Sequence, residues 1–265
     1  MRQSLLSGQR GLNLIELMIS IVIGLFISLM VVQYLSTSSK LFKRQGVDVN
    51  LESNATFAIS YLSQFIRQAG SNSPVGTDVP FHIGSCEGED PNDPDNPCTY
   101  NSNAADGSDQ IAVQMVSVNQ RDCVGNEVDE GERIANVFSV VDSSLFCRGY
   151  SVTDRQWLGE GESLIDGIDQ LQVLYGVTDD SGVIDRYVNA SEVAQDGVAD
   201  IDALAMWDRI RSVKLAVLVS DGNNAGTENE EARQYQLLDA AEVEFTDRVS
   251  RKVYTTTITI NNKLL

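Results

Sequence analysis

The sequence predicts an α+β protein in which one long N-terminal helix packs on an antiparallel β-sheet domain. Three observations predict this. An uncharged apolar run covers residues 17–35, apolar residues recur at helical spacing over 51–69, and after residue 109 they alternate with a period of two. Spacings of three to four residues are typical of a helix, and a period of two is typical of a strand. A helix with an apolar stripe and a sheet with an apolar face are expected to cover each other.

The predicted helix covers residues 12–69 and ends at Gly70, because glycine commonly terminates helices. Its first part, 12–35, is apolar on all sides and long enough to cross a bilayer. Its second part, 36–70, is amphipathic, and its apolar stripe must pack against apolar side chains from elsewhere in the protein. The stripe consists of Leu51, Ala55, Ala58, Leu62, Phe65 and Ala69. At 1.5 Å per residue, the whole helix would be about 87 Å long.

The remaining residues, 71–265, are predicted to form a β-rich domain that begins with a loop. Prolines at 91, 94 and 97 exclude a regular helix or central strand between Cys86 and Cys98. The clearest strand patterns lie at 169–177, 212–220 and 253–261, and weaker ones lie at 110–118, 135–141 and 241–247. Turn-forming residues follow two of these segments, at 179–182 and 220–222.

The charge is divided unevenly along the chain. The formal net charge is −19, yet residues 1–45 hold five basic residues and a single acidic one, which leaves 14 basic against 37 acidic residues in 46–265. A body this acidic repels nucleic-acid phosphates. The composition therefore argues against direct nucleic-acid binding.

The four cysteines, Cys86, Cys98, Cys123 and Cys147, show no CxxC spacing, and His82 is the one histidine. No set matches the spacing of a zinc site. An even number of cysteines in an exported domain favours two disulfides. Three pairings are possible; we favour Cys86–Cys98 with Cys123–Cys147, and four buried free thiols are the alternative.

Glu16 is the unusual residue of the apolar segment, because a charged group at the centre of a membrane helix costs roughly 2.5–3.5 kcal/mol and less near its end. Such a residue is a functional candidate whose partner must be named. The alternative is an interfacial glutamate whose side chain reaches water. Basic residues flank the run on both sides, at 2 and 10 and at 40, 43 and 44, so charge counting leaves the orientation open. A cleaved secretory signal is disfavoured because its apolar region is shorter, about 7–15 residues.

The stretch GLNLIE, residues 11–16, resembles the cleavage motif of type IV prepilins and type II secretion pseudopilins. The resemblance implies that 1–11 is a leader, that a prepilin peptidase cuts between Gly11 and Leu12, and that Leu12 is then N-methylated. It also implies that Glu16 pairs with the α-amino group of a neighbouring subunit. Leu12 and Asn13 stand where the family usually has Phe and Thr, which puts the efficiency of methylation in question.

Four further blocks resemble the PilW family of minor pilins, in the same order: FIRQAG, LIDGIDQLQVLYGV, IRSVKLAVLVSD and RKVYTTTITINN. They occupy 65–70, 164–177, 210–221 and 251–262. Two departures are Ser71, where the family often has an aromatic residue, and Asn261, where it tends to have Arg. The J-type pseudopilin of type II secretion is the nearest alternative.

The PilW resemblance implies a minor pilin of a priming or tip complex in the type IV pilus, with other minor and major pilins and a PilY-type tip adhesin as partners. It further implies a single pass through the inner membrane by 12–35, with 71–265 in the periplasm, and later a place in the filament.

An enzyme is the hypothesis from a different class, and the sequence does not support it. A catalytic triad would have to use His82, which lies between two apolar residues, and no GxSxG is present. No cofactor is expected apart from a candidate Ca²⁺ site in the proline loop, where a solvated acidic loop is the alternative. Its candidate ligands are Glu87, Glu89, Asp90, Asp93 and Asp95. A weaker cluster, Asp179, Asp180 and Asp185, is explained most simply by a hairpin turn.

Overall fold

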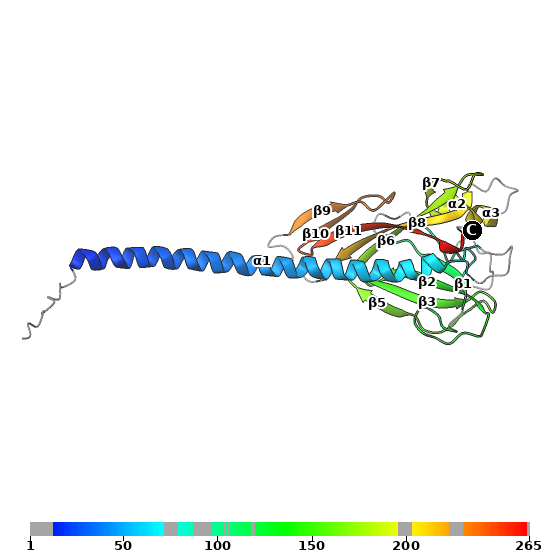
Figure 1. Ribbon diagram of the computed structural model, residues 1–265, viewed down its shortest axis with the longest axis horizontal. Coiled ribbons are helices and arrows are strands. Elements are labelled where there is room, and N and C mark those ends of the chain that lie inside the picture. The colour runs from blue at the N-terminus through cyan, green and yellow to red at the C-terminus, as the bar shows by residue number, and fades with distance from the viewer. Residues whose placement is uncertain are drawn as a thin grey trace, which may run out of the picture. The chain divides into compact units, whose positions relative to one another are not determined.

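The computed structural model describes residues 13–71, 79–86, 97–102, 104, 107–117, 120–195, 203–222 and 230–263. The chain forms two compact units, Met1–Gly46 and Val47–Leu265. Helix α1 (Leu14–Gln68) contributes to both units (Figure 1). In the first unit, its side chains are exposed almost throughout. The second unit contains the hydrophobic core.

In the second unit, α1 turns one stripe of side chains inward. Leu51, Ala55, Ala58, Leu62 and Ile66 are buried, and Gly70 ends the helix with a φ of 71°, a conformation that glycine adopts readily. The Gly70 N–H donates to the carbonyl of Gln114, 2.8 Å away. The predicted helix is thereby confirmed over its described part.

One residue of the predicted stripe is placed differently. Phe65 is only half-buried, and Ile66 is the residue that enters the core. The ring of Phe65 packs along the side of the helix against Phe138, with ring centroids 5.3 Å apart. Phe65 therefore borders the buried stripe, and Ile66 continues it.

Two larger antiparallel sheets and a hairpin make up the strands described in the second unit. The first sheet contains β1 (Ile111–Val116), β2 (Arg133–Val141), β3 (Ser144–Ser151), β4 (Gln156–Trp157) and β5 (Glu162–Asp166), in the order β1-β2-β3-β4 with β5 beside β3. The second contains β6 (Ile168–Thr178), β7 (Ile184–Val188), β8 (Ile210–Ser220) and β11 (Arg251–Thr259), in the order β11-β8-β6-β7. Strands β9 (Glu231–Tyr235) and β10 (Val243–Asp247) form the hairpin.

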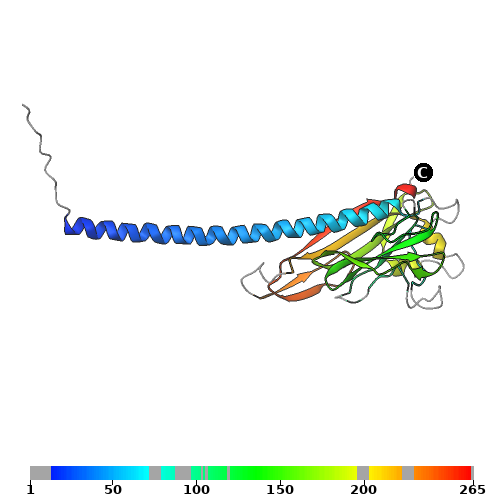
Figure 2. The same cartoon turned by 90° about the horizontal axis from the view of Figure 1, so that it is seen from below.

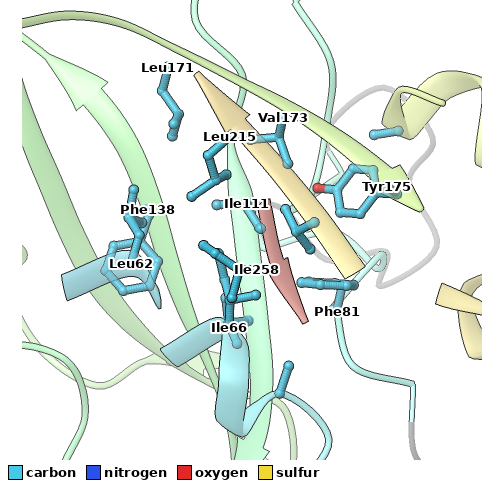
Figure 3. Close-up of a cluster of buried hydrophobic side chains, with 14 of the residues drawn as sticks. Leu62, Ile66, Phe81, Ile111, Phe138, Leu171, Val173, Tyr175, Leu215 and Ile258 are labelled. Carbon is cyan, nitrogen blue, oxygen red and sulfur yellow. The ribbon is translucent and has the colours of Figure 1, made fainter. Parts of the chain in front are cut away.

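Three short helices complete the described elements: α2 (Ala190–Gln195), α3 (Ala203–Asp208) and the 3₁₀ turn η1 (Asn261–Lys263). In Figures 1 and 2, the strands of the second unit run alongside the cyan part of α1. The core lies where this part of α1 meets the two sheets. Figure 3 shows Leu62 and Ile66 of α1 facing side chains from both sheets, including Phe138 of β2, Leu215 of β8 and Ile258 of β11.

The α+β fold class is therefore confirmed, and each of the six predicted strands overlaps an observed one. The single sheet implied by the sequence is replaced by two sheets and a hairpin. Strands β3, β4, β5, β7 and β9 were not predicted. Strand β3 has buried residues on both faces, so it lacks the alternation by which a half-exposed strand is recognised.

Candidate functional site

The exposed apolar surface of α1 is the main candidate site. Along 14–35 every large hydrophobic side chain is at least half exposed, with Leu14 at 74 % and Phe26 at 60 %. Among the described residues, α1 is the one helix with the length and apolar composition needed to cross a membrane. A continuous apolar surface of this length does not remain in water, because soluble proteins rarely expose large apolar patches. It requires lipid or another protein as its surroundings.

Glu16 lies in the first turn of this helix. The carbonyl of Asn13 accepts the N–H groups of Glu16 and Leu17 at 2.9 and 3.1 Å, which starts the helix there. An acidic side chain in the first turn also complements the positive end of the helix dipole. The side chain of Glu16 is exposed. Gly11 and Leu12, the residues of the predicted cut, lie outside the described residues.

Two serines in the apolar run are satisfied within the helix itself. The Ser20 hydroxyl donates to the carbonyl of Glu16 at 2.7 Å, and the Ser28 hydroxyl donates to the carbonyl of Gly24 at 2.8 Å. A hydroxyl bonded in this way can enter an apolar environment without a partner from elsewhere. Glu16 carries the one charged side chain of residues 13–35, and these helix-internal bonds do not serve its carboxylate.

Both disulfides of the favoured pairing are present. Cys86 is bonded to Cys98 and Cys123 to Cys147, so none of the four cysteines is free. The second disulfide belongs to the main core, where the Tyr61 hydroxyl of α1 donates to the carbonyl of Cys123. Burial raises the pKa of Tyr61, and the nearby Asp122 raises it further. The alternative of four free thiols is wrong.

His82 packs within the folded domain. Its ring stacks on Tyr150 with centroids 5.6 Å apart. Its backbone N–H donates to the carbonyl of Ala112, and its backbone carbonyl accepts from the Thr99 hydroxyl. Burial lowers the pKa of His82. These described contacts give no support to a catalytic triad.

The structure also brings His82 close to the Cys86–Cys98 disulfide, which the sequence analysis did not foresee. One ligand atom from each of the three residues lies within 4.8 Å of the others. Sulfurs joined in a disulfide are not thiolates, so this group does not form a metal centre in the oxidised chain. The spacing of the three residues matches no zinc motif, and the proximity arises because the chain folds back at residues 97–98.

Of the two acidic clusters, the structure describes the one at Asp179, Asp180 and Asp185. All five candidate calcium ligands of the proline loop lie outside the described residues. In the second cluster, the Asp179 carboxylate accepts N–H groups from Ser181 and Val183, and its side-chain bond to Ser181 is the main reason its pKa is lowered. Asp180 forms an ion pair with Arg209 at 2.9 Å. The hairpin-turn interpretation accounts for the contacts of Asp179, and Asp180 pairs with a residue outside that hairpin.

Comparison with known proteins gives one family match. The model of the family described as "Type IV Pilus-assembly protein W" matches residues 128–262, about half of the chain. Among solved structures, five chains match. One is a type IV-like pilin from Thermus thermophilus, with 12 % sequence identity, 80 % of this chain and 98 % of that chain covered, and a TM-score of 0.44. No curated protein matches.

The matched residues include both long central strands of the second sheet, β6 and β8, together with its edge strand β11. Three of the four sequence blocks that resemble this family lie in the matched region. On this match, the chain belongs to the PilW family of type IV pilus assembly proteins.

Proposed function

We propose that this chain is a minor pilin, cut after Gly11 by a prepilin peptidase, that helps to prime or cap a type IV pilus. The observation that carries the proposal is the exposed apolar part of α1 with a single carboxylate, Glu16, in its first turn. The family match of residues 128–262 supports a role in pilus assembly. No catalytic step belongs to this function, because the protein acts by occupying a place in an assembly.

The proposed mechanism begins in the inner membrane. Residues 1–11 form the leader, 12–35 the single membrane pass, 36–70 the amphipathic continuation and 71–265 the periplasmic domain. The two disulfides support an oxidising compartment for that domain. After the cut and N-methylation at Leu12, the apolar helix leaves lipid for the core of a filament. Both surroundings are apolar, so this transfer loses little hydrophobic free energy.

The pairing of Glu16 directs this transfer. In lipid, its carboxylate has no charge partner within the apolar part of its own helix, since 13–35 holds no other charged residue. In the filament, the free α-amino group of a neighbouring subunit supplies one. An ion pair in an apolar environment is much stronger than one in water, because water no longer screens it.

The partners we propose are the prepilin peptidase, other minor and major pilins, a PilY-type tip adhesin, and membrane lipid through 12–35. The J-type pseudopilin of type II secretion shares the cleavage motif. Deletion distinguishes the two assemblies: loss of surface pili and twitching supports the pilus, whereas loss of exoprotein secretion with intact pili contradicts it.

The cleavage step is tested by replacing Gly11 with valine. The peptidase needs a small residue at the cut, so the Gly11→Val chain should keep its leader, while the wild-type chain should begin at Leu12. Gly8→Val is the matched control, because it places the same side chain in the leader away from the cut and should be processed normally. Intact-mass spectrometry of the membrane-bound chains reads the result. A Gly11→Val chain that begins at Leu12 would contradict the proposal.

A further inference from the structure

The Cys86–Cys98 disulfide and His82 form a compact group of three potential ligands. Their ligand atoms lie within 4.8 Å of one another, and the Cα atoms of the two cysteines are 5.2 Å apart. Cys98 is fully buried and Cys86 is 7 % exposed. Around them, Ala112, Ala135, Val137 and Tyr150 form a small apolar cluster separate from the main core. The group is therefore shielded from water on most sides.

The imidazole of His82 is held in a defined orientation. Its face stacks on the ring of Tyr150, and its side chain is hydrogen-bonded to that of Gln114, a buried residue of β1. Histidines that bind metals usually use one ring nitrogen for the metal and the other for such a bond, which fixes the ring and its tautomer. In this structure, one ring nitrogen of His82 lies within 4.8 Å of both sulfurs.

We propose that reduction of Cys86–Cys98 creates a zinc site made of these two thiolates and the His82 imidazole. A dithiol reductant supplies two electrons and two protons and becomes a disulfide itself, and the S–S bond of Cys86–Cys98 breaks to give two thiols. Zinc binding then releases both thiol protons. A water molecule completes the four-coordinate arrangement that zinc prefers.

Zinc binding would require only a small movement of the two cysteine side chains. Two thiolates on a tetrahedral zinc ion, each about 2.3 Å from it, lie about 3.8 Å from each other. Side-chain rotation can separate the sulfurs by this amount while the Cα atoms stay in place. Zinc and the disulfide are then alternative ways to close the same loop, one in the reduced chain and one in the oxidised chain. This proposal does not depend on the proposed pilin function.

The second disulfide serves as an internal control. Cys123 and Cys147 lie in the main core, and the N–H of Cys123 is bonded to the Asn136 side chain. No histidine can join them, because His82 is the only one in the chain. Their thiols offer two ligands rather than three.

The full chain in detergent micelles is first reduced with a phosphine, because a phosphine adds no thiols that would bind zinc. Zinc alone is then added as the probe. Competition with a chromophoric chelator measures affinity, and alkylation followed by peptide mapping locates the site. The reduced chain should bind one zinc ion and the oxidised chain none. Zinc should slow alkylation of Cys86 and Cys98, because a thiolate bound to the metal is no longer a free nucleophile, and leave Cys123 and Cys147 unaffected.

Two variants make the test specific. His82→Phe keeps an aromatic ring on Tyr150 but removes the nitrogen ligand, so zinc affinity should fall about tenfold or more. The double variant Cys123→Ser/Cys147→Ser should bind zinc as the wild type does. Wild-type affinity in His82→Phe, equal protection of all four cysteines, or no zinc on the reduced chain would each overturn the proposal. Circular dichroism of every sample shows whether the variants share the wild-type fold.

Discussion

At the scale of single residues, Glu16 and Asp109 are two carboxyl groups in unusual surroundings for different reasons. Glu16 is exposed on a helix whose apolar surface requires lipid or protein around it. Asp109 is 1 % exposed inside the folded domain, where its two oxygens accept the N–H groups of Ser102 and Val173. We propose that the first group pairs with another chain, whereas the second is held by backbone N–H groups of its own chain.

Under the proposed function, replacement of Glu16 by alanine should leave cleavage intact but reduce assembly. Without the carboxylate, the α-amino group of a neighbouring subunit is buried without a counter-charge, which is the costly result of breaking a buried pair. Ser20→Ala, one turn further along the helix, is the control and should assemble normally. The amounts in the inner membrane and in sheared filaments are compared at equal expression. Equal incorporation of Glu16→Ala and the wild type would show that this carboxylate does not guide assembly.

The pKa of Asp109 should make the stability of the domain depend on pH. Burial raises this pKa from 3.8 to about 7, against the lowering effect of its two backbone hydrogen bonds, and Asp239 adds to the rise. The folded state thus favours the protonated form. Its stabilising contribution is fully present below pH 3.8 and is lost as the pH rises through 7.

Asp109→Asn should therefore flatten the pH dependence of the free energy of unfolding between pH 4 and 8. An asparagine side chain does not titrate in this range. Its NH₂ group would face a backbone N–H that Asp109 accepts, and the resulting destabilisation is the same at every pH. Denaturant unfolding of the variant and the wild type at several pH values measures the difference between them. A difference that stays constant from pH 4 to 8 would contradict the assigned pKa.

At the scale of elements, the second half of α1 is part of the domain's core. Its buried stripe supplies side chains that both sheets contact, so the domain without this helix would expose apolar surface. Arg251 links the second sheet to the hairpin through two ion pairs, a buried one within the sheet and a half-exposed one to the hairpin. Arg251 of β11 contacts Asp169 of β6 at 2.6 Å and Asp247 of β10 at 2.8 Å, and its guanidinium lies over the ring of Phe245.

Leu62→Ala should destabilise the domain by roughly 2–5 kcal/mol, because it removes a fully buried side chain and leaves a cavity. Gln64→Ala, two residues along on the exposed side, is the matched control and should change stability by about 0.5 kcal/mol or less. Urea unfolding of the full chain in detergent measures both. Equal effects would show that this part of α1 does not pack on the sheets in solution.

At the scale of the whole molecule, the chain combines an apolar, basic N-terminal segment with an acidic domain closed by two disulfides. The Cys123–Cys147 bridge lies in the main core and spans 24 residues, whereas Cys86–Cys98 spans 12 and lies in the smaller cluster. Cross-linking a longer loop removes more entropy from the unfolded chain, by about 0.6 kcal/mol for each doubling of its length.

Both disulfides should stabilise the domain, and Cys123–Cys147 should contribute more. The double variant Cys123→Ala/Cys147→Ala should lose roughly 3–4 kcal/mol, and Cys86→Ala/Cys98→Ala somewhat less. Urea midpoints of the two variants and the wild type, all under oxidising conditions, give the comparison. An unchanged midpoint in the first variant would mean that this bridge does not stabilise the domain.

The sequence by itself determined the long helix, six of the strands and the likeness to PilW pilins. Helical and strand periods, an apolar run and a short motif are local patterns, so each can be recognised without knowing which distant residues touch. For the same reason, the exposed surface that carries Glu16 could be predicted: it depends on consecutive residues of one helix.

Only the tertiary structure decided which of three cysteine pairings forms, that the strands divide into two sheets, and that Asp109 is buried. It also placed His82 beside Cys86 and Cys98, although 16 positions separate His82 from Cys98. The physical reason is common to all four. Each depends on contacts between residues that are not neighbours in the chain, and these arise only when the chain folds into the main core and the smaller apolar cluster.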